Sequence, residues 1–265
     1  MVSRNDIKFV RSLALKKNRD VAGMFLAEGR KVVGELLDAF QCERLYYTLD
    51  CGECVPDRLS GMAVPVSHSE MERMSLQKTP QGILAVFRKP DYPQASISEV
   101  AHSELCLALD GIQDPGNMGT ILRIADWFGI SHVFAEKGSA DVYSPKVVGA
   151  SMGALARVHI HYVGLCEELS GIDSDFIFGT FLDGENIYSS ELADHGVIIM
   201  GNEGNGISEA VGNMVKRRLL IPSYPDGRPT SESLNVAIAT SIVCAEFRRR
   251  FFTTNQNLAG TRQKS

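Results

Sequence analysis

The chain has 265 residues, 44% of them hydrophobic and 22% charged, as in a globular protein of one or two domains. No apolar run reaches the roughly 18–20 residues needed to cross a bilayer, and the N-terminus lacks the apolar core of a signal peptide, so we expect a cytoplasmic protein without membrane segments. The net charge of −5 argues weakly against nucleic acid, and six scattered cysteines favour a reducing compartment.

Charge is unevenly distributed along the chain. Residues 1–31 contain eight basic and three acidic side chains, a local charge of +5. A local basic face can bind phosphate on an acidic protein, although a solvated helix face is an equal alternative. Cys51 and Cys54 form a lone CxxC without a second pair at zinc-finger spacing, so an incidental turn is favoured over a zinc or redox site.

Residues 1–90 predict a small α/β domain. Apolar residues recur at helical spacing over 5–17, 28–40 and 68–76, and short apolar runs predict strands over 44–49, 63–66 and 82–88. Residues 91–103 contain prolines and serines without periodicity, so they predict a linker.

From residue 104 to residue 252 strands and helices alternate. Apolar runs predict strands, and helices are expected between the early strands and at the end of the domain, over 117–129, 144–155 and 236–245. This alternation predicts a mostly parallel sheet covered on both faces. The tail 253–265 is polar and aperiodic, and we expect it to be disordered. The strands are expected at 105–109, 131–135, 158–161, 176–181, 197–200 and 219–221.

A first motif follows the strand that ends at Asp110. Gly111 and Pro115-Gly116 bend the chain, and Asn117 is placed to cap the next helix. Arg123 lies six residues further on, so the two side chains are offset by about 240° and do not share a helix face. Taken alone, this motif would be read as a cap and a surface arginine.

Two further loops follow neighbouring apolar strands near the C-terminal end. The run Gly201–Gly206 lacks both the GxGxxG spacing and the Gly-Lys-Ser/Thr of a phosphate-binding loop. Glu203 would repel a pyrophosphate, which favours a ligand without phosphate, such as an adenosine wrapped by backbone groups. In the third motif, Ile221-Pro222 ends a strand, and Ser233 or Asn235 can cap the following helix.

The three motifs in this order resemble the SpoU (TrmH-type) family of RNA 2′-O-ribose methyltransferases. The matching pieces are Asn117 and Arg123 after an Asp-Pro-Gly turn, Gly201-Asn-Glu-Gly, and Ile221-Pro followed by Ser233-Leu-Asn. Residues 1–90 are similar to the RNA substrate-binding domain often fused in front, a small L30e-like α/β domain.

The resemblance implies the SPOUT fold, with a deep trefoil knot in an α/β domain, an exception to the rule that connections do not thread. It implies S-adenosylmethionine as cofactor, no metal, an RNA substrate, and a homodimer formed through the knotted domain. Ribosomal RNA is favoured over tRNA because of the N-terminal extension.

The resemblance also assigns residues to roles. Arg123 would clamp the substrate phosphate and stabilise the developing alkoxide, because a guanidinium essentially never deprotonates in proteins. The other catalytic positions would be Asn117, Ser233, Asn235 and Glu203. The cofactor would contact Thr180, Gly201, Leu220, Ile221, Leu234 and Asn235. RNA would contact Lys8, Arg11, Lys16, Lys17 and Arg30.

One segment departs from the family pattern. The spacer Ser223–Glu232 is longer and more polar than usual, which leaves the cofactor contacts within it open. A non-catalytic RNA-binding or ribosome-assembly protein on the same fold is the main alternative, and the intact catalytic positions speak against it. A nicotinamide dehydrogenase is disfavoured because the glycine-rich loop comes late in the chain.

Overall fold

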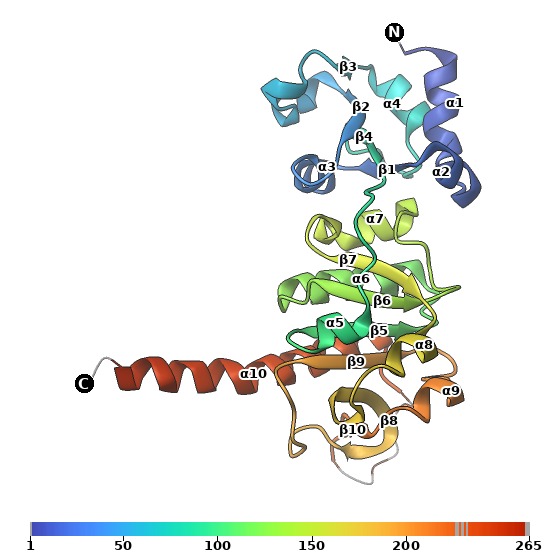
Figure 1. The fold of residues 1–265 in the computed structure, drawn as a ribbon. Coiled ribbons are helices and arrows are strands. Elements are labelled where there is room, and N and C mark those ends of the chain that lie inside the picture. The colour runs from blue at the N-terminus through green and yellow to red at the C-terminus, as the bar shows by residue number, and fades with distance from the viewer. Residues whose placement is uncertain (1, 226–227, 229–230, 232, 263–265) are drawn as a thin grey trace. The chain divides into compact units, whose positions relative to one another are not determined.

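The structure is a computed structural model that describes residues 2–225, 228, 231 and 233–262, with side chains up to Phe251. The elements form two compact units (Figure 1). The first comprises the residues up to Pro93, Asp114–Arg123 and Ala140–Arg157, and the second Gln94–Gln113, Ile124–Ser139 and the residues from Val158 onward.

The first unit is built on a four-stranded sheet of order β1-β4-β2-β3, in which only β2 and β3 run parallel among its pairs. One face packs on α1 and α4, with Val10, Met74 and Val86 in its core. On β1, Phe25 stacks on Phe87 of β4 at 5.6 Å between ring centroids. The elements of this unit are α1 (Arg4–Ser12), α2 (Lys16–Ala22), β1 (Met24–Glu28), α3 (Arg30–Leu37), β2 (Cys42–Tyr47), η1 (Leu49–Cys54), η2 (Asp57–Leu59), β3 (Ala63–Pro65), α4 (His68–Met74), β4 (Ile83–Arg88), α7 (Pro145–Ser151) and η3 (Ala154–Ala156).

The second unit is built on a six-stranded sheet of order β10-β8-β9-β5-β6-β7 (Figure 1). All of its strand pairs are parallel, which confirms the predicted parallel sheet. Its elements are α5 (Ile97–Ala101), β5 (Leu105–Asp110), β6 (His132–Glu136), β7 (His159–Val163), α8 (Leu165–Leu169), η4 (Ser174–Phe176), β8 (Ile177–Asn186), β9 (Gly196–Gly201), α9 (Glu209–Gly212), β10 (Arg217–Leu220) and α10 (Val236–Arg262). The helix α6 (Pro115–Trp127) begins in the first unit and ends in the second.

Helices cover both faces of this sheet, as parallel sheets require. Residues of α5, α8 and α9 bury one face together with Ala108, Phe134 and Ile199. On the other face, Phe247 of α10 meets Phe178 of β8 edge to face at 5.0 Å. The central strands β5 and β9 are buried along their whole length, which explains why they read as continuous apolar runs.

The helix predicted over residues 5–17 is wrong, because the chain forms α1 and α2 with a break between them. Leu13 is buried, whereas Leu15 is 64% exposed and has an extended backbone ahead of α2. The guanidinium of Arg19 donates to the carbonyl oxygens of Leu13 and Ala14, both at 2.8 Å. Arg19 therefore satisfies backbone groups that a continuous helix would have bonded itself.

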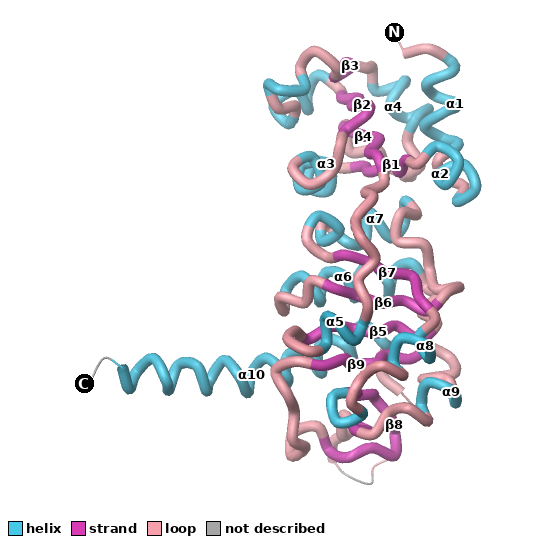
Figure 2. The backbone as a smooth tube through the Cα atoms, in the orientation of Figure 1, coloured by secondary structure: helices cyan, strands magenta, loops and turns pink. Residues whose placement is uncertain are grey.

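Two further segments differ from expectation. Residues 97–101, within the predicted linker, form the helix α5, because Ser96 and Glu99 make a reciprocal capping box and Ile97 is buried. The backbone of α10 continues to Arg262 (Figure 2), so the segment expected to be disordered is helical up to that residue. Residues 253–262 contain no proline to stop a helix. Residues 263–265 lie outside the described part of the chain.

The six cysteines are free thiols. Burial raises the pKa of Cys244 to about 12, and it also raises the pKa of the buried Cys106. Cys166 on α8 is exposed. Cys51 and Cys54 lie in η1, in the connection between β2 and β3.

Candidate functional site

A cavity of about 370 Å³ opens at the carboxyl edge of the second unit's sheet, beside the middle of β8 and the ends of β9 and β10. This is the edge at which open parallel sheets bind ligands, and the volume lies within the usual range of about 300–1,000 Å³ for small-molecule sites. The cavity is lined by Thr180, Phe181, Leu182, Met200, Gly201, Asn202, Glu203, Gly204, Asn205, Gly206, Ile207, Leu219, Leu220, Ile221, Ser233, Leu234, Val236 and Ala239.

The loop after β9 is held in shape by Asn202. Its backbone exchanges two hydrogen bonds with Gly206, at 2.8 and 3.0 Å. Its side-chain oxygen accepts from the amides of Gly204 and Asn205, and its side-chain nitrogen donates to the carbonyl of Gly111 at 2.7 Å. Asn202 therefore accepts from two backbone amides of the loop that follows β9.

Gly201 is required by close packing at the start of the same loop. A Cβ atom here would lie 2.2 Å from the backbone carbon of Gly206 and from the nitrogen of Ile207. Real Cβ atoms do not approach other heavy atoms so closely, so the loop could not fold back over a side chain.

Asp110 connects the loop to the neighbouring strand. It is the last residue of β5, it is only 7% exposed, and its carboxylate accepts from the amide of Ser208 at 2.7 Å. Together with the bond from Asn202 to Gly111, this fixes the β9 loop against the end of β5. The sequence offered a signal for Asp110, an acidic residue at the end of an apolar strand, but nothing that paired it with Ser208.

Most of the cofactor residues expected from the sequence do line one cavity. These are Thr180, Gly201, Leu220, Ile221 and Leu234, and the predicted catalytic residues Glu203 and Ser233 line it as well.

Asn235 has a different observed role from Ser233. Its side-chain oxygen accepts from the amides of Ala237 and Ile238, so it is the cap of α10, and it is absent from the described lining. In the spacer Ser223–Glu232, residues 226, 227, 229, 230 and 232 lie outside the described part of the chain, and so do their expected cofactor contacts.

Asn117 and Arg123 lie on α6, in the part of that helix that belongs to the first unit. The prediction that Asn117 caps the helix is wrong. The cap is Asp114, whose carboxylate accepts from the amide of Asn117 at 2.8 Å, a bond that lowers the pKa of Asp114. Pro115 takes the first helical position, where its missing N–H costs nothing. Arg123 is exposed.

The basic residues expected to contact RNA fall into two groups. All five are exposed, Lys8 and Lys17 included. Three others have partners within the first unit: Lys16 forms an ion pair with Asp20, Arg11 donates to the carbonyls of Arg73 and Ser75, and Arg30 lies near Asp50 and Glu53.

The cavity composition favours an uncharged or cationic ligand. Within the described lining there is no Lys or Arg, while Glu203 contributes a negative charge and the glycine-rich loop contributes backbone groups. A pyrophosphate would lack a counter-charge here. Apolar walls and backbone donors suit a nucleoside with a sulfonium group, so S-adenosylmethionine fits the residues present. The fold and the cavity define an α/β protein with a nucleoside-cofactor site.

Comparison with known proteins identifies the family. Residues 104–245, more than half of the chain, match the model of the SpoU rRNA Methylase family, and residues 4–85 match the MRM3-like substrate binding domain. The chain therefore belongs to the SpoU rRNA Methylase family, which confirms the resemblance inferred from its three motifs.

Curated relatives match over different lengths. The chain is 28% identical to the 23S rRNA (guanosine(2553)-2′-O)-methyltransferase RlmP of Bacillus subtilis, over 91% of this chain and 95% of that protein. It is 36% identical to the human mitochondrial rRNA methyltransferase 3 over 54% of this chain, but the match spans only 36% of the human protein.

Solved structures agree over nearly the whole chain. A putative RNA methyltransferase of the TrmH family from Porphyromonas gingivalis is 44% identical, with a TM-score of 0.83 and coverage of 94% of this chain and 99% of that one. An AdoMet-bound rRNA methyltransferase from Sinorhizobium meliloti is 26% identical, with a TM-score of 0.80 and coverage of 94% and 97%.

Replacing Asn202 with alanine is expected to weaken S-adenosylmethionine binding about 10- to 100-fold, because the loop after β9 loses three side-chain hydrogen bonds with a net contribution of about 1 kcal/mol each. Isothermal titration calorimetry measures the change. Asn213→Ala, an exposed asparagine after α9, is the matched control. Equal affinities of the two variants would contradict the role given to Asn202.

Proposed function

We propose that this chain is an S-adenosylmethionine-dependent RNA 2′-O-ribose methyltransferase that acts on ribosomal RNA. The observation that carries the proposal is the cavity beside the middle of β8 and the ends of β9 and β10 in a chain of the SpoU rRNA Methylase family. The described lining of this cavity contains no basic side chain. The rRNA methyltransferase names of its relatives and the match to a substrate binding domain favour ribosomal RNA.

Each loop of the cavity has a task in this proposal. Thr180, Gly201, Ile221 and Leu234 would hold the cofactor through main-chain groups, and Leu220 and Ile221 would flank the adenine. When bound, S-adenosylmethionine supplies an electrophilic methyl group on a positively charged sulfur. The protein then has to align the ribose hydroxyl with that group and manage its proton.

Arg123 would bind the substrate phosphate and stabilise negative charge as it develops on the 2′-oxygen. A guanidinium is suited to this task because it stays charged and can bind two oxygens at once. Asn117 would orient Arg123 or the ribose. Ser233 would hold the loop between the cavity and α10, and Asn235 would hold the same loop from the cap position.

The RNA would bind first to the substrate-binding module, which comprises residues 2–93. The exposed Lys8 and Lys17 would be among its phosphate contacts. We further propose a cytoplasmic homodimer and a trefoil knot in the second unit. The dimer is supported by α10, where Ile238 is 54% exposed next to small residues that allow close helix packing.

Mapping of 2′-O-methyl groups on total RNA, from cells with and without this gene, tests the function. We expect a ribosomal RNA site to disappear. If a tRNA site disappears instead, the substrate is tRNA and the proposed reaction still holds. If no site disappears and calorimetry detects no binding of S-adenosylmethionine, the chain is a non-catalytic RNA-binding protein and the proposal is wrong.

A further inference from the structure

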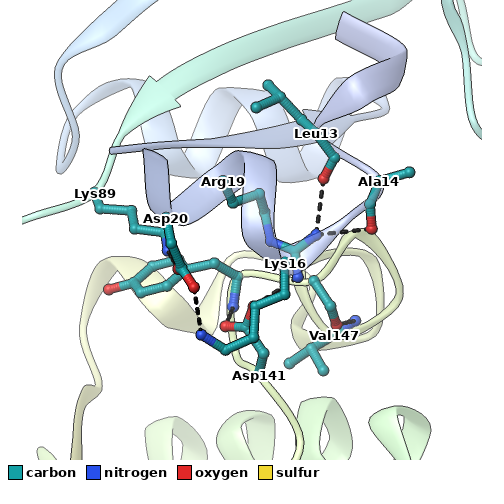
Figure 3. A network of polar contacts seen from close by, with 10 residues as sticks. Leu13, Ala14, Lys16, Arg19, Asp20, Lys89, Asp141 and Val147 are labelled. Carbon is teal, nitrogen blue, oxygen red and sulfur yellow. Dashed lines mark hydrogen bonds and ion pairs between the residues drawn. The ribbon is translucent and has the colours of Figure 1, made fainter. Parts of the chain in front are cut away.

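A buried ion pair connects α2 to the turn before α7. Nη2 of Arg19 lies 2.6 Å from Oδ2 of Asp141, and the two side chains are only 3% and 13% exposed. Figure 3 shows the two residues facing each other across this contact. Buried charges persist when they are paired, and removing one partner leaves the other unsatisfied. The contact therefore fixes two segments that are far apart in the sequence.

Arg19 and Asp141 each also form hydrogen bonds with backbone groups close to them in the sequence. The guanidinium of Arg19 also donates to the carbonyls of Leu13 and Ala14, as the dashed lines in Figure 3 show. The second carboxylate oxygen of Asp141 accepts from the amide of Tyr143 at 3.0 Å. A planar guanidinium bonded in three directions has little freedom to rotate. The pair is thus a stiff connection.

Aromatic and charged side chains surround the pair. The ring of Tyr143 packs on Phe25 of β1 at 4.9 Å between centroids, and the ammonium of Lys89 lies 5.3 Å from the centre of the same ring. Lys89 is itself paired with Asp20 at 2.7 Å. Together with Lys16, it lowers the pKa of Asp20 to about 2. The segment 140–144 is therefore held against α2 and β1 by more than one kind of contact.

The same segment leads into α7, and α7 packs on α6, the helix that bears Arg123. Ser144 caps α7, and α7 packs closely on α6 at Gly119. A Cβ atom at Gly119 would lie 2.5 Å from Cβ of Ala150 and 2.9 Å from the carbonyl oxygen of Val147. Arg123 follows Gly119 by four residues, which places it one turn further along the same side of α6. A displacement of α7 would consequently displace the turn that carries Arg123.

We propose that Arg19 and Asp141 are positioning residues that fix the substrate-binding module, residues 2–93, to the turn of α6 that carries Arg123. The inference rests on the proposed function, because it needs RNA held by the module and a phosphate reached by Arg123. Neither residue touches substrate. Their role is to keep the distance between bound RNA and Arg123 constant, since a misplacement of about 1 Å can cost about 100-fold in rate.

The test uses the full-length variants Asp141→Asn and Arg19→Lys. Asp141→Asn removes the charge and keeps the shape, and Arg19→Lys keeps the charge but cannot reach the two carbonyls and Asp141 together. Asp38→Asn is the matched control, because it breaks the exposed pair of Asp38 with Arg58, which lies wholly within the module. RNA methylation at varied RNA and cofactor concentrations separates kcat from KM, and hydrogen–deuterium exchange follows residues 115–123.

We expect kcat to fall about 10- to 100-fold in both variants, with KM for RNA and for S-adenosylmethionine within about twofold of the wild type. Amides in 115–123 should exchange faster in both variants and not in Asp38→Asn. Unchanged kcat together with unchanged exchange would overturn the inference. A fall in kcat that is fully explained by the fraction of unfolded protein in each variant would overturn it as well. A wild-type chain that methylates no RNA would instead refute the proposed function, and the exchange result would still decide whether the pair fixes α6.

Discussion

Gly201→Ala is expected to weaken cofactor binding about 10- to 100-fold. The added methyl group would lie 2.2 Å from the backbone of Gly206 and Ile207, and backbone atoms cannot yield as the end of a side chain can. Overpacking of this kind costs about 1–3 kcal/mol, and each 1.4 kcal/mol corresponds to a factor of ten in affinity. Calorimetric titration with S-adenosylmethionine measures the effect.

Gly212→Ala is the matched control for this experiment. Gly212 lies in α9 of the same unit, and the nearest atoms to its added methyl group would be at 3.6 Å, an ordinary contact distance. Its cofactor affinity should equal that of the wild type. If Gly201→Ala binds the cofactor as tightly as Gly212→Ala does, the cavity is not the cofactor site.

Arg123→Ala is expected to lower turnover about 100- to 1,000-fold while the affinity for S-adenosylmethionine stays unchanged. The estimate follows the loss of one group that stabilises developing negative charge in a transition state. Arg123→Lys should also be impaired, because an ammonium cannot bind two phosphate oxygens in the geometry of a guanidinium. Single-turnover methylation of RNA measures both rates.

Lys137→Ala is a suitable control, because Lys137 is an exposed cation in the turn after β6. It should methylate RNA at the wild-type rate. Near-normal turnover of Arg123→Lys would refute the two-oxygen clamp, and near-normal turnover of Arg123→Ala would remove Arg123 from the catalytic machinery.

The sequence predicted the parallel sheet because buried strands have a clear signature. β5 is apolar as far as Asp110 and β9 is apolar between its terminal glycines, and each strand leads into a polar or glycine-rich turn. Local patterns of this kind also predicted that the segments containing Gly201 and Ile221 follow strand ends. Both residues do line one cavity.

Hydrogen bonds between distant residues were not predictable in the same way. Asn202 and Gly111 are 91 residues apart, and Asp110 and Ser208 are 98 apart. Nothing in the periodicity of either segment indicates its partner. Arg19 is a similar case. The basic residues within 1–31 left a phosphate-binding face and a solvated helix face as equal alternatives, whereas Asp141, 122 residues away, offsets the cost of burying the guanidinium of Arg19.

The N-terminal caps of the helices could not be predicted for a more local reason. Asn117 and Asp114 are both good caps, and the sequence does not say which of two neighbouring candidates has the extended backbone that a cap needs. The same ambiguity existed between Ser233 and Asn235, and there the structure selects Asn235.

The burial of the thiols has a practical consequence for labelling. Cys106 and Cys244 are enclosed and resist deprotonation, and Cys51 is buried too, whereas Cys166 on α8 faces solvent. Because thiolates are the species that react with maleimides, a maleimide dye should attach first at Cys166. The natural chain therefore already offers a preferred fluorophore position on its second unit, without an engineered cysteine.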